Sequence, residues 1–293
     1  MISTMVAGCA RESIIDKVEK EYENGRYREA IFLVRHHFKG GGEKTPELLF
    51  LAGKSWLQLG AEAEAEDAFS EVYRSDSTWA PVLAGFLRDR AVIGIESGSR
   101  GKGERLMMQA IAYDTLLDFG KYNATAGRLL IERREFRAAI PFLDRYLLEY
   151  PDTTGAASVM LNLGAAYEGA GRTEEAISVY RRFVDMYPKS RLLTTVSWQL
   201  ENLLLMKSEE LYENGKVEEA EQYLIDLTRT AGSSIVRERA NFLLGEMFEE
   251  RGDIEKAIFY YTETIQINLG SSGRLVEKAK ERIEKIDLSK KNR

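Results

Sequence analysis

Residues that cross-link chains or bind metals are scarce in this sequence of 293 residues. It has one cysteine, Cys9, and two histidines, His36 and His37, which are neighbours. A single cysteine excludes an internal disulfide and a thiolate metal cluster. Neighbouring histidines on a helix point about 100° apart, so one metal ion does not easily take both. We therefore expect no metal site, no cofactor and no catalytic constellation built on cysteine or histidine.

Long apolar runs and an excess of positive charge are also missing. No stretch approaches the roughly 18 apolar residues that a membrane-spanning helix needs, and charged residues soon follow the run at 203–206. The 47 acidic residues outnumber the 41 basic ones, which are spread along the chain, and the net charge is −6. A surface that follows a phosphate backbone needs clustered cations, so we expect no nucleic-acid partner.

The sequence does contain internal repetition. The phrase Tyr-Glu-Asn-Gly begins at Tyr22 and again at Tyr212, and each time an alanine follows the glycine by five residues. The same spacing recurs at Gly60/Ala65, Gly171/Ala176 and Gly252/Ala257, and with arginine in the place of glycine at Arg134/Ala139. Self-similarity of this kind indicates an array of repeats, not one globular core.

The distances between these alanines predict the number of repeats. Ala30, Ala65, Ala139, Ala176, Ala220 and Ala257 are separated by 35, 74, 37, 44 and 37 residues. Because 74 is twice 37, a degenerate repeat is expected between Ala65 and Ala139, with a helix over 81–96, a turn over 97–103 and a helix over 104–117. The spacing of 44 predicts a lengthened first helix within 192–213. Together these spacings predict seven repeats.

Each repeat reads as an antiparallel pair of helices. Apolar residues recur at three- and four-residue steps, as in Ile177, Tyr180, Phe183, Val184 and Tyr187. Gly171, Gly215 and Gly252 are expected to end first helices in the left-handed conformation. Prolines at 46, 81, 151 and 188 are expected between repeats, because proline stops a preceding helix. Pro141 is the exception, and we interpret it as a first-turn proline or a local kink.

These residues resemble the tetratricopeptide repeat family. In the fifth repeat the positions that carry the resemblance are Leu163, Gly164, Tyr167, Gly171, Ala176, Tyr180, Phe183 and Pro188. The resemblance implies an all-α fold, a right-handed α-solenoid of about seven helix pairs with a C-terminal capping helix. We expect residues 1–10 to be the remnant of a lipoprotein signal or a disordered N-terminus, 11–270 to form the solenoid, and 271–293 to form the capping helix and a basic tail.

The resemblance also implies a binding groove lined by the first helix of each repeat, and hence a protein or peptide partner. Projecting the groove positions of the family onto this chain gives Lys54, Lys121, Arg128, Leu161, Leu205, Glu209, Tyr212, Arg239, Phe242 and Glu246.

The surroundings of Cys9 have a separate implication. Val6-Ala7-Gly8-Cys9 is similar to a bacterial lipobox, in which the cysteine carries a lipid, although the eight residues before Cys9 include no Lys or Arg. Either the start lies further upstream, or the cysteine is a chance residue of a frayed terminus. Helices that close on Tyr150-Pro151 and Tyr187-Pro188 resemble those of BamD-like outer-membrane lipoproteins. Any contact with a membrane is then expected only through a lipid on Cys9.

The sequence therefore predicts a non-catalytic scaffold that grips a peptide or a helical partner. Its expected location is the bacterial cell envelope, at the periplasmic face of the outer membrane, with a role in outer-membrane or periplasmic assembly. The alternative is a cytoplasmic adaptor for a regulator or a secretion apparatus. An enzyme is disfavoured, because the repeats occupy almost the whole chain.

Overall fold

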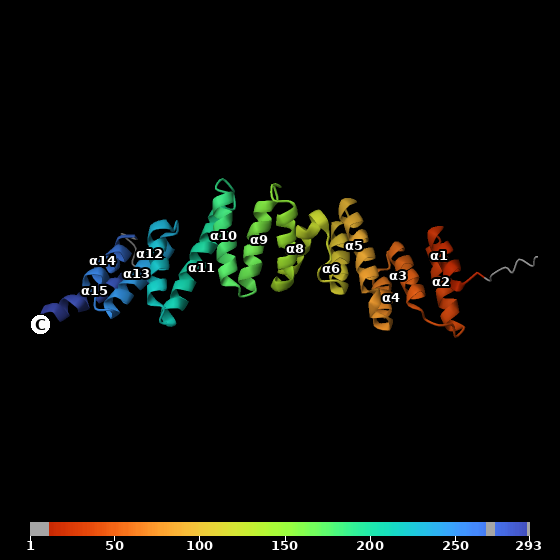
Figure 1. Cartoon of the computed structure of the whole chain (residues 1–293), viewed down its shortest axis with the longest axis horizontal. Helices are drawn as coiled ribbons and strands as arrows, with labels where there is room; N and C mark the ends of the chain where they lie inside the picture. Colours follow the sequence, from red (N-terminus) through yellow and green to blue (C-terminus); the bar gives the residue numbers. More distant parts are fainter. Residues whose placement is uncertain (1–11, 268–272, 292–293) are drawn as a thin grey trace, which may run out of the picture. The chain divides into compact units, whose positions relative to one another are not determined.

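The computed structural model describes residues 12–267 and 273–291, with side chains up to residue 288. Within these ranges the regular secondary structure consists of fifteen α-helices and two short 3-10 helices. The chain divides into two compact units, one up to Phe119 and one from Gly120 onward. An all-α repeat solenoid is confirmed, because the helices follow one another in pairs along each unit (Figure 1).

The first unit contains three helix pairs, and neighbouring helices lie side by side. Its elements are α1 (Ile14–Glu23), α2 (Tyr27–Lys39), α3 (Pro46–Gln58), α4 (Glu62–Ser75), η1 (Ser77–Trp79), α5 (Ala80–Glu96) and α6 (Arg100–Tyr113). Pro46 is the first residue of α3 and Pro81 the second of α5, so these prolines begin first helices. Proline fits there because an N–H at the start of a helix would have no acceptor within the helix, so its absence costs nothing.

The second unit contains four pairs and one further helix. Its elements are η2 (Gly120–Tyr122), α7 (Asn123–Glu132), α8 (Phe136–Glu149), α9 (Ala156–Gly169), α10 (Thr173–Met186), α11 (Leu193–Glu213), α12 (Val217–Thr230), α13 (Ser234–Glu250), α14 (Ile254–Ile267) and α15 (Arg274–Lys291). The lengthened helix of repeat six is confirmed, since α11 has 21 residues and α9 has 14.

The turn inside each pair has one recurrent geometry. Gly171 has a φ of 75°, and its N–H donates to the carbonyl of Glu168, while Arg172 N donates to the carbonyl of Tyr167. These two bonds satisfy carbonyls that the end of a helix leaves free. The predicted left-handed turns at Gly215 and Gly252 are confirmed by φ values of 76° and 80°. Arg134 holds the same turn with a φ of 62°.

Close contact between paired helices depends on small residues opposite large ones, sixteen positions apart in the sequence. A Cβ added at Gly164 would lie 2.2 Å from Cε1 of Tyr180, and one added at Gly245 would lie 2.6 Å from Cδ1 of Tyr261. Both tyrosine rings are fully buried. Gly164 therefore leaves room for the second helix of its pair.

The third repeat differs from its predicted boundaries. The helix α6 begins at Arg100 and ends at Tyr113, so the expected turn over 97–103 is shorter. Gly98 forms the turn with a φ of 86°, and Gly103, five residues later, occupies the position of the repeat alanine. An added Cβ on Gly103 would lie 2.6 Å from the carbonyl oxygen of Ala91, which shows why no larger residue fits.

Pro141 also differs from expectation. It lies in the interior of α8, at the sixth residue, so it is not a first-turn proline. The helix continues on both sides of it, from Phe136 to Glu149.

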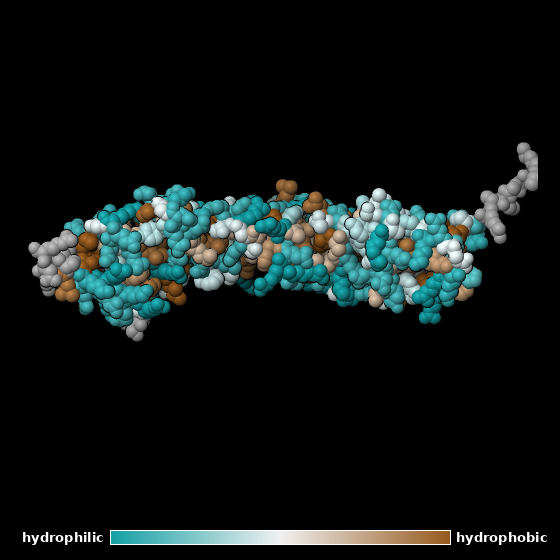
Figure 2. Space-filling model, turned by 90° about the horizontal axis from the view of Figure 1, so that it is seen from below, coloured by the Kyte–Doolittle hydropathy of each residue, from teal (hydrophilic) through white to brown (hydrophobic). Residues whose placement is uncertain are grey.

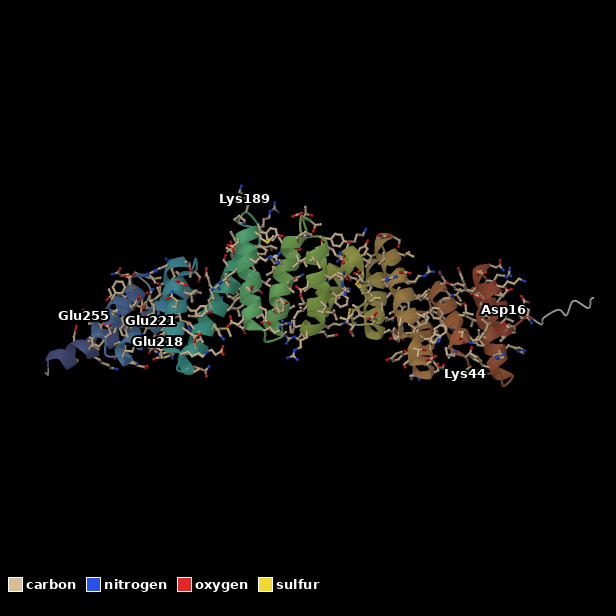
Figure 3. All side chains as sticks on the ribbon, in the orientation of Figure 1. Asp16, Lys44, Lys189, Glu218, Glu221 and Glu255 are labelled. Carbon is tan, nitrogen blue, oxygen red and sulfur yellow. The ribbon has the colours of Figure 1, made fainter. Side chains whose placement is uncertain are left out.

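Ion pairs link one helix pair to the next in the second unit. Glu218 and Glu221 on α12 (Figure 3) both face Arg251, at 3.7 and 2.5 Å, and Arg251 follows the end of α13. The helix α15 packs against α13 and α14, and Ala279 and Ile286 lie in the same core cluster as Tyr261. On the face shown in Figure 2, hydrophilic residues dominate and hydrophobic residues form separate patches.

Candidate functional site

The predicted groove residues lie mainly on first helices. Lys54 is on α3 in the first unit; in the second unit Lys121 is in η2, Arg128 on α7, Leu161 on α9, Leu205, Glu209 and Tyr212 on α11, and Arg239, Phe242 and Glu246 on α13. Since α11 and α13 contact each other, the second unit brings several of these residues together.

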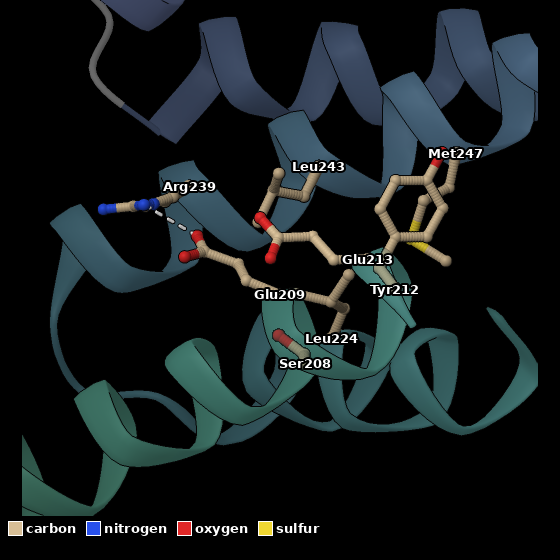
Figure 4. Close-up of a pocket in the computed structure, with 8 residues that line it drawn as sticks. All are labelled: Ser208, Glu209, Tyr212, Glu213, Leu224, Arg239, Leu243 and Met247. Atoms are coloured by element: carbon tan, nitrogen blue, oxygen red, sulfur yellow. Dashed lines mark ion pairs between the residues drawn. The ribbon is translucent and has the colours of Figure 1, made fainter. Parts of the chain in front are cut away.

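Glu209, Tyr212 and Arg239 line one hollow of about 260 Å³. We call it the α11/α13 hollow; its other lining residues are Ser208, Glu213, Leu224, Leu243 and Met247. Arg239 and Glu209 lie at one end and Tyr212 and Met247 at the other (Figure 4). The hollow thus places an ion pair and an aromatic ring around an aliphatic base.

The ion pair at this site is exposed on its arginine side. Arg239 Nη2 lies 2.7 Å from Glu209 Oε1, and the arginine side chain is 54% exposed, whereas this carboxylate oxygen is buried. A partner that offers its own acidic or polar group can therefore approach the guanidinium of Arg239.

Tyr212 is held by the neighbouring first helix. Its hydroxyl donates a hydrogen bond to Glu250, at the end of α13. Burial and this carboxylate raise the pKa of Tyr212 to about 12, because both disfavour a phenolate. At neutral pH the ring is an uncharged wall of the hollow, fixed by its hydroxyl group.

At this hollow, repeat six departs from its neighbours. Ser208 and Leu224 occupy the positions that Gly164 and Tyr180 occupy in repeat five, again sixteen residues apart. In repeat five the Tyr180 hydroxyl donates to Glu168 at 3.4 Å. Leu224 has neither ring nor hydroxyl, and Tyr212 takes the position of Glu168. Leu224 lines the hollow at the position where Tyr180 packs against Gly164 in repeat five.

Glu246 lies on α13, further along the helix than Arg239. It is half-buried, burial raises the pKa of its carboxyl group, and Arg282 of α15 lies 3.5 Å away and opposes that effect. Glu246 lines a second hollow together with Arg239 and residues of α15.

Two predicted groove residues are corrected by the structure. Leu205 is 5% exposed and Phe242 is 4% exposed, and both belong to the apolar core of the second unit. Leu205 packs against other helices and offers a partner little surface, whereas Phe242, although mostly buried, still lines the second hollow. Leu161 is also partly buried in a core cluster.

The remaining predicted residues do not join the α11/α13 hollow. Lys54 Nζ lies 4.3 Å from the ring centroid of Tyr22 and 5.3 Å from that of Phe50. Lys121 lies over the ring of Tyr122, and Arg128 forms an ion pair with Glu132. The nine predicted residues of the second unit therefore do not line one continuous site.

Five lining residues were not predicted: Ser208, Glu213, Leu224, Leu243 and Met247. Two of them carried a signal in the sequence. Ser208 and Leu224 interrupt the alternation of glycine with an aromatic ring that holds in repeats two, five and seven. This signal alone does not single out repeat six, because Val34 in repeat one and Leu143 in repeat four also stand where the aromatic ring is missing.

Cys9 lies outside the described residues. Among the residues that the structure does describe, no group of three or more His, Cys, Asp or Glu side chains is placed to hold a metal ion. Nor is any helix in the same ranges long and apolar enough to span a membrane.

Comparison with solved structures identifies similar repeat proteins. The C-terminal part of a tetratricopeptide-repeat protein of Cytophaga hutchinsonii is 16% identical, with 90% of this chain and 98% of that chain aligned and a TM-score of 0.40. A tetratricopeptide-repeat protein of Bacteroides fragilis is 13% identical over 69% of this chain and 98% of that chain, with a TM-score of 0.47. No curated protein sequence matches the chain.

The family model of the tetratricopeptide repeat matches three segments, residues 16–78, 125–191 and 205–268. Each segment corresponds to two helix pairs, and together they make up about two thirds of the sequence. The segments leave out the pair α5 and α6, which is the degenerate third repeat, and the first part of the lengthened α11. The chain belongs to the tetratricopeptide repeat family.

Proposed function

We propose that this protein is a non-catalytic scaffold that binds a protein partner through the α11/α13 hollow. Repeat arrays of helix pairs generally act by presenting an extended surface to another protein. Segments bound in such grooves contribute apolar anchors and a few oriented polar contacts.

One observation carries the proposal: Glu209, Tyr212 and Arg239, chosen as groove positions from the family resemblance, line a single hollow of about 260 Å³. An apolar base of Leu224, Leu243 and Met247 lies among polar groups on two helices. Tyrosine and arginine are enriched among residues that dominate binding energy at interfaces.

Site-specific photo-crosslinking tests this proposal on the full chain. A photoreactive phenylalanine analogue replaces Tyr212 in one variant and Phe259 in a control variant. Phe259 is 56% exposed on α14, a second helix, so it samples solvent without lining the hollow. In cells, we expect a discrete adduct from position 212 and none from position 259, and mass spectrometry then identifies the partner.

Purified partner is next titrated against Tyr212→Ala and Arg239→Glu, with Arg181→Glu on α10 as the charge-matched control. Both groove variants should weaken binding while helicity stays constant, and the control should bind as the parent does. Adducts at position 259 as strong as those at 212, or equal affinity in all variants, would move the binding surface elsewhere.

We propose further that the scaffold works in a bacterial cell envelope, at the periplasmic face of the outer membrane, held by a lipid on Cys9. The Val6-Ala7-Gly8-Cys9 pattern and the Tyr-Pro ends of α8 and α10 support this proposal. Mass spectrometry of Cys9 from membrane fractions tests it. An unmodified Cys9 in a soluble fraction, with Met1 retained, favours the alternative of a cytoplasmic adaptor.

A further inference from the structure

A second hollow of about 330 Å³ lies between α13 and α15. We call it the cationic notch; its lining residues are Arg239, Phe242, Leu243, Glu246, Arg274, Leu275 and Lys278. We propose that the cationic notch recognises an acidic side chain next to a bulky apolar side chain in the protein partner. This inference rests on the proposed function, since Arg239 and Leu243 line both hollows.

Charge is unevenly paired around the notch. Glu209 lies 2.7 Å from Arg239, and Glu246, which lines the notch, lies 3.5 Å from Arg282 and is also attracted by Lys278. Arg274 and Lys278 are exposed and form no ion pair with any described residue. The lining residues therefore carry three positive charges and one negative charge, in a chain whose net charge is −6.

The start of α15 reinforces this charge. Arg274 is the first residue of this 18-residue helix. The N-terminus of a helix has a positive partial charge, which adds to the charges of Arg274 and Lys278, while Glu277 in the same turn opposes it.

The base of the notch selects the class of ligand. Phe242 is 4% exposed at the bottom, and Leu243 and Leu275 are partly buried beside it. Lys278 Nζ lies 6.0 Å from the centroid of the Phe242 ring, so cation and apolar surface are adjacent. An inorganic anion or a nucleic-acid backbone gains nothing from apolar surface. A peptide with an acidic residue beside leucine, isoleucine or phenylalanine satisfies both parts.

Peptide selection on the full chain tests the inference. Immobilised protein is panned with a phage library of random 12-residue peptides, and the enriched sequences are synthesised for fluorescence polarisation. We expect enrichment of Asp or Glu next to large apolar residues. The variant Arg274→Glu/Lys278→Glu should lose about tenfold or more in affinity, and added salt should weaken binding to the parent. The control Lys280→Glu/Lys285→Glu changes the same charge on the same helix outside the notch and should bind within about twofold.

The outcomes separate this inference from the proposed function. Enriched peptides without acidic residues, or equal binding by the notch variant, overturn the notch assignment. If such peptides still lose binding in Tyr212→Ala, the α11/α13 hollow remains a binding site while the notch does not. Failure of every peptide to bind also overturns the notch assignment, whereas the proposed function is judged separately by the crosslinks from position 212.

Discussion

Replacing Arg134 with glycine should stabilise the second unit. Among the described residues Arg134 is the one non-glycine with a positive φ, at 62°, whereas glycine occupies the equivalent turn position at 25, 60, 98, 171, 215 and 252. Its N–H donates to the carbonyl of Ile131 at 2.8 Å, so the turn has the same bonds as the glycine turns. The arginine therefore holds a geometry that its Cβ disfavours.

The magnitude follows from two opposing terms. A left-handed conformation costs an ordinary residue roughly 1–2 kcal/mol, because Cβ approaches the following carbonyl oxygen. Glycine loses more chain entropy on folding, by roughly 0.5–1 kcal/mol. Arg134 is exposed and forms no ion pair with a described residue, so no lost contact offsets the gain. We expect Arg134→Gly to raise the free energy of unfolding by about 1 kcal/mol.

Urea unfolding followed by circular dichroism at the helix band measures this difference as a shift of the midpoint at unchanged slope. In thermal unfolding the shift should be about 2–4 °C. Arg134→Ala removes the charge and keeps Cβ, so its free energy of unfolding should rise little. Arg133→Gly places glycine at a φ of −86° and should destabilise. A midpoint for Arg134→Gly at or below that of Arg134→Ala would refute the reasoning.

Three further predictions concern packing, the hollow and pH. Gly164→Ala should lower the free energy of unfolding by about 1–3 kcal/mol, since its Cβ would lie 2.2 Å from the buried ring of Tyr180. Gly85→Ala on α5 is the control, because an added Cβ there meets nothing within 4 Å. Urea unfolding compares the two variants. Ser208→Gly/Leu224→Tyr restores the pair of repeat five, so it should fill the α11/α13 hollow and abolish the crosslink from position 212 without loss of helicity. Because the pKa of Tyr212 is raised in the folded state, its contribution to stability is complete below pH 10 and declines as the pH rises towards about 12. In a spectrophotometric titration of tyrosinate, Tyr212→Phe should remove a group that ionises near that pH; an unchanged upper end of the titration would contradict this assignment.

The fold was largely predictable because the repeated residues act locally. A glycine at Gly171 or Gly215 ends a helix through its own backbone conformation, and a spacing of sixteen residues from Gly164 to Tyr180 places one ring over one glycine. These constraints need no knowledge of distant residues. The third repeat was misplaced because glycines were interpreted as a turn, although Gly98 and Gly103 have the five-residue spacing of the repeat.

The groove was less predictable, because periodicity alone does not decide which of several adjacent apolar residues faces the core. Leu203, Leu204, Leu205 and Met206 are consecutive on α11, yet Leu205 is 5% exposed and Met206 is 63% exposed. The outcome depends on the angle at which α12 and α13 cross this helix. That angle is set by side chains on three helices at once, and no single repeat encodes it.

The departures from the repeat therefore deserve more weight in locating a binding site than the repeat itself. Glycine opposite an aromatic ring closes the space within a pair, as Gly164 and Tyr180 do. Where Ser208 faces Leu224, the second helix no longer fills that space, and the side chains of Arg239 and Tyr212 border a hollow instead. A tyrosine at position 224 would add packing within this pair and reduce the opening. At this hollow, residues that break the repeat pattern lie beside residues that do not repeat at all.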